Sequence, residues 1–123
     1  MADVLFWLYL ANATLLIVHE IDSAYRQEWK LFRLPGGISF FLVLHLPLVF
    51  LMLYGLVQVH QESLAGQIFS LVLSLAGIFA FSIHTFFTYR GHPEFKTPVS
   101  VLILIAILGV SVAQLVTTLL WLA

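Results

Sequence analysis

Cysteine is absent from this 123-residue chain, and charged residues are scarce. Without a thiol the chain can form no disulfide, thiolate zinc site or iron–sulfur cluster, so His, Asp or Glu would have to hold any metal ion. Charged residues make up 9% of the chain and hydrophobic residues 62%, which is too little polar surface for a soluble domain. The net charge of −1 gives no general attraction for nucleic acid. These absences together indicate an integral membrane protein.

Basic residues are also absent before Arg26, which argues against a cleavable signal peptide at the start, because such peptides begin with a basic region. A hydrocarbon core of about 30 Å needs roughly 20 apolar residues per helix. The chain has room for four such helices and a short amphipathic segment at residues 26–34, which we expect to lie in the headgroup zone. The sequence therefore predicts an all-α, polytopic four-helix bundle forming one transmembrane domain over residues 1–123, with helices at about 4–25, 38–59, 64–89 and 99–122.

The few basic residues are distributed unevenly. All five lie in the first or the third connection between predicted spans, namely Arg26, Lys30, Arg33, Arg90 and Lys96. Positive charge is retained on the cytoplasmic side of membrane proteins. We therefore expect these connections in the cytoplasm, both termini on the other side, and a location in a bacterial inner membrane.

Small and polar residues recur on two of the predicted helices at spacings of three and four. Such seams let membrane helices approach closely and form hydrogen bonds. We expect both seams to face the interior of the bundle. The seam of the third helix comprises Gln67, Ser70, Ser74, Gly77, Phe81, His84 and Thr88, and that of the last helix comprises Ala106, Gly109, Ala113 and Thr117.

Ionisable residues inside the predicted spans point to a functional site, because each is costly in a membrane unless it is paired. His19 and Asp22 are three residues apart and share one helical face. With a rise of 1.5 Å per residue, His19, His45 and His84 fall at a similar depth near the basic end. Histidine and carboxylate ligands suit zinc, iron or manganese. We therefore predict a divalent metal site formed by His19, Asp22, His45 and His84, with Glu20 as the acid/base group.

This ligand set predicts an integral membrane metalloprotein, such as a hydrolase or oxidase that acts on a lipid-soluble substrate. Glu28 and His92 are candidates to cap the site from the cytoplasmic end. One alternative is haem, with His45 and His84 as axial ligands. Another is an accessory subunit of a larger membrane complex or a homo-oligomer, in which buried polar groups only specify helix pairing. Membrane lipid is the expected surrounding in each case.

The stretch His19-Glu20-Ile21-Asp22-Ser23-Ala24-Tyr25, with Glu28-Trp29, Phe32 and Leu34-Pro35-Gly36-Gly37 after it, resembles an uncharacterised family of small four-helix bacterial membrane proteins, a domain of unknown function. This resemblance implies the four-helix architecture and a functional unit of His19, Glu20 and Asp22. The chain is more loosely similar to membrane proteins with an HxxEE motif, from which it departs because Asp22-Ser23 stands where that motif has two glutamates.

Overall fold

The structure, a computed structural model, describes residues 2–93 and 96–123. Four long helices and one short helix make up the described chain: α1 (Ala2–Tyr25), α2 (Glu28–Leu31), α3 (Gly37–His60), α4 (Leu64–Tyr89) and α5 (Pro98–Leu122). The described residues contain no strand. Each long helix is long and apolar enough to cross a membrane. The predicted all-helical architecture with four such helices is therefore confirmed.

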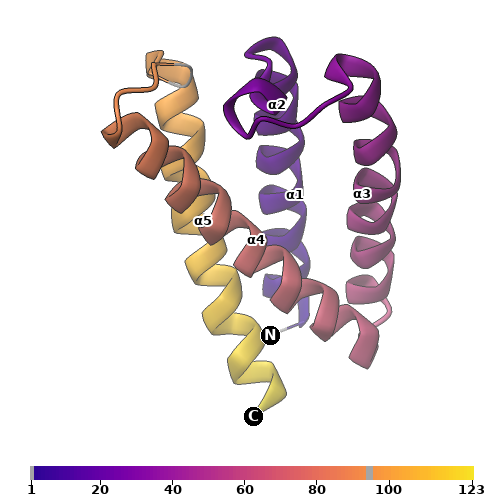
Figure 1. The fold of residues 1–123 in the computed structure, drawn as a ribbon. Helices are drawn as coiled ribbons and strands as arrows, with labels where there is room; N and C mark the ends of the chain where they lie inside the picture. The colour runs from indigo at the N-terminus through magenta and orange to yellow at the C-terminus, as the bar shows by residue number, and fades with distance from the viewer. Residues whose placement is uncertain (1, 94–95) are drawn as a thin grey trace.

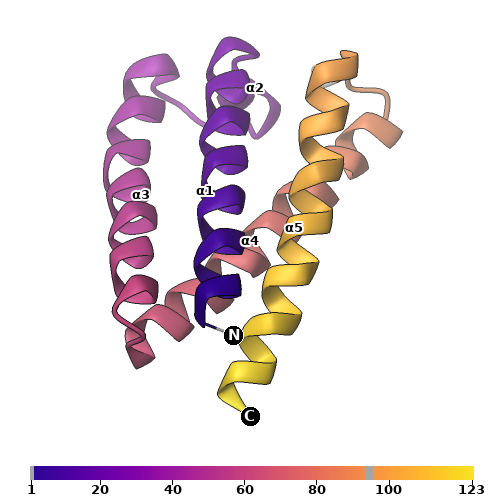
Figure 2. The same ribbon diagram turned by 180° about the vertical axis from the view of Figure 1, so that it is seen from behind.

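The four long helices are not parallel to one another. α1 lies between α3 and α5, and α4 crosses the bundle obliquely (Figures 1 and 2). α4 starts beside the end of α3, to which a short turn joins it, and finishes beside the start of α5. α4 packs against both of these helices. Because α4 stays close to α5, it diverges from α3 towards the end of the bundle that carries α2.

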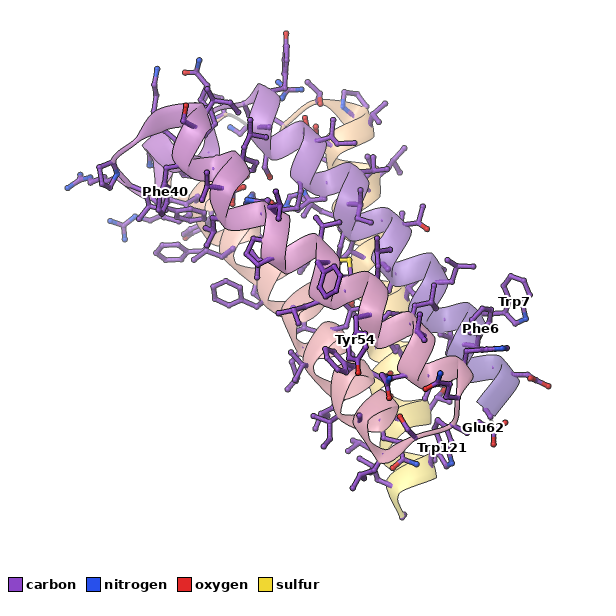
Figure 3. The ribbon with its side chains drawn as sticks, turned by 90° about the vertical axis from the view of Figure 1, so that its right-hand side faces the viewer. Phe6, Trp7, Phe40, Tyr54, Glu62 and Trp121 are labelled. Carbon is purple, nitrogen blue, oxygen red and sulfur yellow. The ribbon has the colours of Figure 1, made fainter. Side chains whose placement is uncertain are left out.

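The two ends of the bundle differ in their residues. The chain termini lie at one end, and α2 and the connection between α4 and α5 lie at the other (Figure 1). The basic connections therefore share one end, opposite the termini. Figure 3 shows Phe6, Trp7, Glu62 and Trp121 near the end with the termini, and Phe40 near the opposite end. Trp is enriched at membrane–water interfaces, so this arrangement is consistent with helices that span the bilayer.

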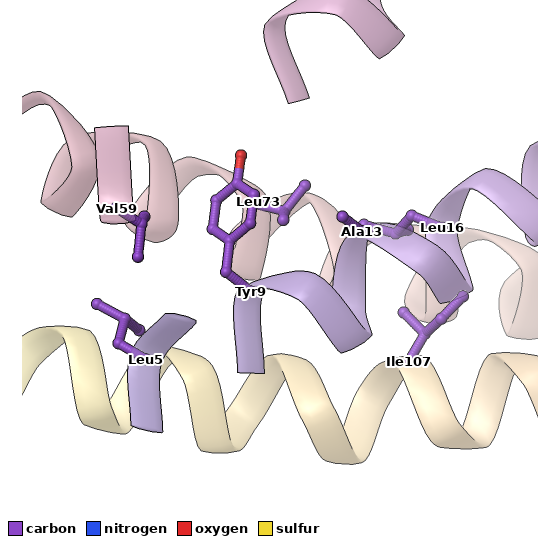
Figure 4. Close-up of a cluster of buried hydrophobic side chains, with 7 residues drawn as sticks. All are labelled: Leu5, Tyr9, Ala13, Leu16, Val59, Leu73 and Ile107. Carbon is purple, nitrogen blue, oxygen red and sulfur yellow. The ribbon is translucent and has the colours of Figure 1, made fainter. Parts of the chain in front are cut away.

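The apolar core is formed mainly by α1, which contributes four of its seven buried residues. Figure 4 shows this cluster, which consists of Leu5, Tyr9, Ala13, Leu16, Val59, Leu73 and Ile107. The Tyr9 hydroxyl donates a hydrogen bond of 2.7 Å to the carbonyl oxygen of Met52. This bond fixes α1 to α3 and satisfies a hydroxyl that would otherwise be buried without a partner.

A network of buried polar side chains joins α1, α4 and α5. The Asn12 amide donates to Ser111 Oγ at 3.0 Å and to Gln114 Oε1 at 2.7 Å. Gln114 Nε2 in turn donates to the carbonyl oxygen and to Oγ of Ser70, at 3.1 and 2.9 Å. Ser70 and Thr118 share a further bond of 2.8 Å between their hydroxyls. Every one of these side chains is fully buried, so the network determines which faces of the three helices meet.

The two predicted seams differ in outcome. On α4, Ser70, Ser74, Gly77 and His84 are buried, as expected. On α5 the prediction is wrong, because the residues that face the bundle are Ser100, Leu104, Ile107, Ser111, Gln114 and Thr118. Gly109 and Ala113 of the predicted seam are exposed. The buried polar side chains, which need partners in an apolar interior, decide the orientation of α5 in preference to its small residues.

Gly77 of α4 packs closely against Ser111 of α5. A Cβ atom added there would collide with Ser111 Oγ, so Gly77→Ala must separate the helices or rotate Ser111 away from Asn12. We expect the free energy of unfolding to fall by about 1–3 kcal/mol, measured by SDS titration in mixed micelles.

Gly109→Ala is the matched control, because a Cβ atom at Gly109 meets nothing within 4 Å. Alanine is favoured over glycine in a helix by up to about 1 kcal/mol, so this variant should be at least as stable as the wild type. An equal loss of stability in both variants would contradict the close packing of α4 on α5.

Candidate functional site

A cavity of about 380 Å³ lies between α1, α3 and α4. Most of its lining is apolar, with residues such as Leu16, Met52, Leu73 and Ala76. Five histidine and glutamate residues also line it, namely His19, Glu20, Glu28, His45 and His84. Small-molecule sites in proteins are typically apolar cavities of roughly 300–1,000 Å³ with a few polar groups. The cavity therefore has the size and composition of a ligand site.

Glu20 and His45 form the closest ionisable pair in the cavity. His45 Nε2 lies 2.5 Å from Glu20 Oε2, and His45 Nδ1 lies 2.7 Å from the carbonyl oxygen of Phe41. A carbonyl oxygen can only accept, so Nδ1 carries the proton of that bond. The imidazole also stacks on the Phe41 ring, with 3.8 Å between ring centroids. The hydrogen bond between Nε2 and Oε2 then contains one proton, which either group can carry.

His84 repeats this arrangement on α4. Its Nδ1 donates to the carbonyl oxygen of Ala80 at 2.8 Å, and its Nε2 lies 3.4 Å from Glu28 Oε1. The side chain is 2% exposed. The His19 ring meets it edge-on, with 4.6 Å between centroids. His19, His45 and His84 thus lie at one level, as predicted, because the His19 ring contacts His84 and His45 bonds to Glu20, the residue next to His19.

Glu28 reaches the cavity from α2, and sequence reasoning gave it only the role of a possible cap. The chain turns back at Gln27, whose φ of 57° is left-handed, and α2 begins at the next residue. Trp29 packs against Phe41 of α3, with 5.6 Å between ring centroids. This contact and the turn place Glu28 over the end of the cavity. The signal in the sequence was the amphipathic segment, in which Glu28 and Trp29 are adjacent.

The environment of Glu28 favours its charged form. Burial alone would raise its pKa, but hydrogen bonds with His84 and Ser23 and the nearby imidazoles outweigh burial and lower the pKa below the ordinary value. Glu28 is also close enough to Glu20 for the two carboxylates to repel one another. The polar end of the cavity therefore combines two carboxylates with three imidazoles.

Asp22 is directed away from this cavity. Its carboxylate accepts from Arg26 Nε at 3.1 Å and from Ser100 Oγ at 2.6 Å. It lines a separate, shallow hollow between α1 and the start of α5. The structure therefore brings together His19, His45 and His84 of the predicted ligand set, with Glu20 beside them, but does not bring Asp22 to them. In the described part of the chain, no three His, Asp or Glu side chains are arranged to hold a metal ion.

The coupling between Glu20 and His45 can be measured. We expect Glu20→Ala and His45→Ala to destabilise the protein non-additively, because each variant removes the same hydrogen bond. The interaction energy in a double-mutant cycle should be about 0.5–3 kcal/mol, measured by SDS titration.

A second cycle of Glu20→Ala with Ser100→Ala serves as the control, since Ser100 bonds to Asp22. These two effects should add within about 0.5 kcal/mol. Additivity in the first cycle as well would show that Glu20 and His45 do not interact.

The comparisons with known proteins identify a family and give no function. Residues 5–120 match the model of a Family of unknown function (DUF6713). This match confirms the resemblance to an uncharacterised family. No curated protein and no solved structure matches the chain.

Proposed function

Because the chain belongs to the Family of unknown function (DUF6713), we propose its function from the geometry of the cavity: it is a membrane-embedded enzyme that binds a lipid-soluble molecule and exchanges a proton with it through Glu20 and His45. One observation carries this proposal. An apolar cavity of about 380 Å³ has three imidazoles and two carboxylates in its lining. A bundle that served only for packing would have no need of these costly groups around a void.

The proton transfer is supported by the orientation of the Glu20–His45 pair. The carbonyl of Phe41 holds the imidazole in the tautomer whose Nε2 faces Glu20. A base that is positioned by a hydrogen bond to a third group is the usual arrangement in acid–base catalysis. A hydroxyl group held beside this pair can give its proton to Glu20, the residue predicted as the acid/base group, and can take a proton back from it.

The proposal is tested by what the protein retains after purification. We expect mass spectrometry of an organic extract of the wild-type protein to identify a bound lipid-soluble molecule in stoichiometric amount. Ala76→Trp should abolish its retention, because Ala76 lines the cavity at its exposed side and an indole there would obstruct the space.

Ala113→Trp is the matched control, because Ala113 is exposed on α5 and does not line the cavity. This variant should retain the molecule. Equal retention by both tryptophan variants would refute binding in the cavity.

A divalent metal is a second candidate, which one observation favours. His45 and His84 both donate from Nδ1 to a backbone carbonyl and direct Nε2 towards a carboxylate. Metal-ligating histidines are commonly oriented by such an outer bond. Of the predicted ligand set, His19, His45 and His84 line the cavity, and these side chains would have to move to bind zinc, iron or manganese together, because the described residues form no three-ligand arrangement. Elemental analysis of the same preparations should then show stoichiometric metal that is lost in His45→Ala and His84→Ala, and a metal-free wild type would exclude this candidate. Haem ligation and an accessory-subunit role stay predictions.

The orientation in the membrane is also part of the proposal. The basic connections lie at the end opposite the termini, so this end should face the cytoplasm of a bacterial inner membrane. The chain has no cysteine, which makes single-cysteine labelling clean. In intact cells, an impermeant maleimide should label Glu62→Cys and leave Arg33→Cys unlabelled. The reverse labelling pattern would show that the protein has the opposite orientation in the membrane.

A further inference from the structure

The cavity extends along the helix axes for about the depth of one lipid leaflet. Its lining on α1 runs from Tyr9 to Glu20, which at 1.5 Å per residue is about 16 Å. Half of a hydrocarbon core of about 30 Å is about 15 Å. Away from the histidines the lining is apolar, from Leu48 to Met52 on α3 and from Phe69 to Ile83 on α4. The space is therefore shaped for an extended hydrocarbon chain whose polar end lies at the His/Glu groups.

The cavity is open sideways, between α3 and α4. Five of its apolar lining residues are exposed: Leu48 and Leu51 of α3, each 47% exposed, Val72 and Phe79 of α4, 59% and 65% exposed, and Ala76 of α4. The described lining residues on α1 and α2 include no exposed side chain, so the exposed ones on α3 and α4 indicate the side on which the cavity opens. The divergence of α4 from α3 (Figure 1) accounts for this opening.

The end of the cavity that carries the ionisable groups is covered. Glu28 of α2 and Phe32 just after it line the cavity, and Trp29 holds this segment on α3 through Phe41. A ligand would thus enter from the bilayer through the side rather than from water through the end.

The charges at the polar end restrict the headgroup. Of the described residues that line the cavity, none is Lys or Arg, whereas two are glutamates. The Glu20–His45 pair shares one proton and therefore has no net charge, and Glu28 favours its charged form. These groups offer a phosphate or carboxylate head no net positive charge to bind. An uncharged hydroxyl both donates and accepts hydrogen bonds, so it can bond to a carboxylate oxygen and to an imidazole nitrogen together.

From these observations, and resting on the proposed function, we infer that the ligand is a single-chain lipid with an uncharged hydroxyl head, a long-chain alcohol, which enters laterally between α3 and α4 and places its hydroxyl at Glu20 and His45. This inference names the substrate class and the entry route of the site, which the proposed function leaves open.

The experiment is photo-cross-linking of full-length protein in phosphatidylcholine nanodiscs. The probe is a hexadecanol with a diazirine at mid-chain, and the matched probe is the corresponding fatty acid. Leu16 and Leu73 line the cavity and are only 5% and 6% exposed, so a chain inside the cavity should label them and lipid outside should not. Leu120 is exposed on α5 and reports contact with bulk lipid.

We expect the alcohol to label Leu16 and Leu73, and an excess of unlabelled hexadecanol to reduce this labelling several-fold while labelling at Leu120 is unchanged. The fatty acid should label the two cavity residues several-fold less. Val72→Trp, at the opening, should slow cavity labelling several-fold, whereas Leu102→Trp on the lipid-facing surface of α5 should not.

Cavity labelling that no competitor reduces, or preferential labelling by the fatty acid, would overturn the inference about the headgroup. Equal cavity-labelling rates in Val72→Trp and wild type would overturn lateral entry. If the alcohol fails while the extract still contains a molecule that Ala76→Trp loses, the proposed function survives and only the ligand class is wrong. If neither binds, both fail.

Discussion

The position of Gln114 determines the arrangement of the bundle. Its amide donates two hydrogen bonds to Ser70 and accepts one from Asn12, so one side chain joins three helices. In hydrocarbon such an amide has no water to bond to, and each unsatisfied group costs several kcal/mol. The three helices can therefore meet only in the register that satisfies it. α4 is thereby held against α5, and the space between α4 and α3 remains for the cavity.

The ring nitrogens of the histidines also need hydrogen-bond partners in the apolar interior. His45 and His84 each use Nδ1 to bond to the carbonyl four residues earlier in their own helix. This local bond removes one choice of tautomer and directs Nε2 into the cavity. Each Nε2 then meets a carboxylate from another element, Glu20 from α1 and Glu28 from α2. The imidazoles on α3 and α4 are thus both protonated at Nδ1 and both direct Nε2 towards a carboxylate.

Much of this could be predicted from the sequence, because hydropathy and helix rise are local quantities. Hydropathy predicts the four spans, and the helix rise predicts the common depth of His19, His45 and His84. The side on which Asp22 lies could not be predicted in this way. His19 and Asp22 share a helical face by spacing, but Asp22 has closer partners in Arg26 and Ser100, and Ser100 belongs to a helix 78 residues away in sequence. Glu28 was undervalued because its position depends on a left-handed residue at Gln27, which composition does not reveal.

The short helix α2 contributes to the site without contributing to the apolar core of the bundle. It has four residues, is preceded by a left-handed turn at Gln27, and is held to α3 through Trp29 and Phe41. A helix of this length has no stability of its own in water, so its place is set by the turn and by its contact with α3. Of the histidine and glutamate residues that line the described cavity, Glu28 alone lies outside the four long helices. A substitution at Glu28 can therefore change the charge at the polar end of the cavity without changing the sequence of any of the four long helices.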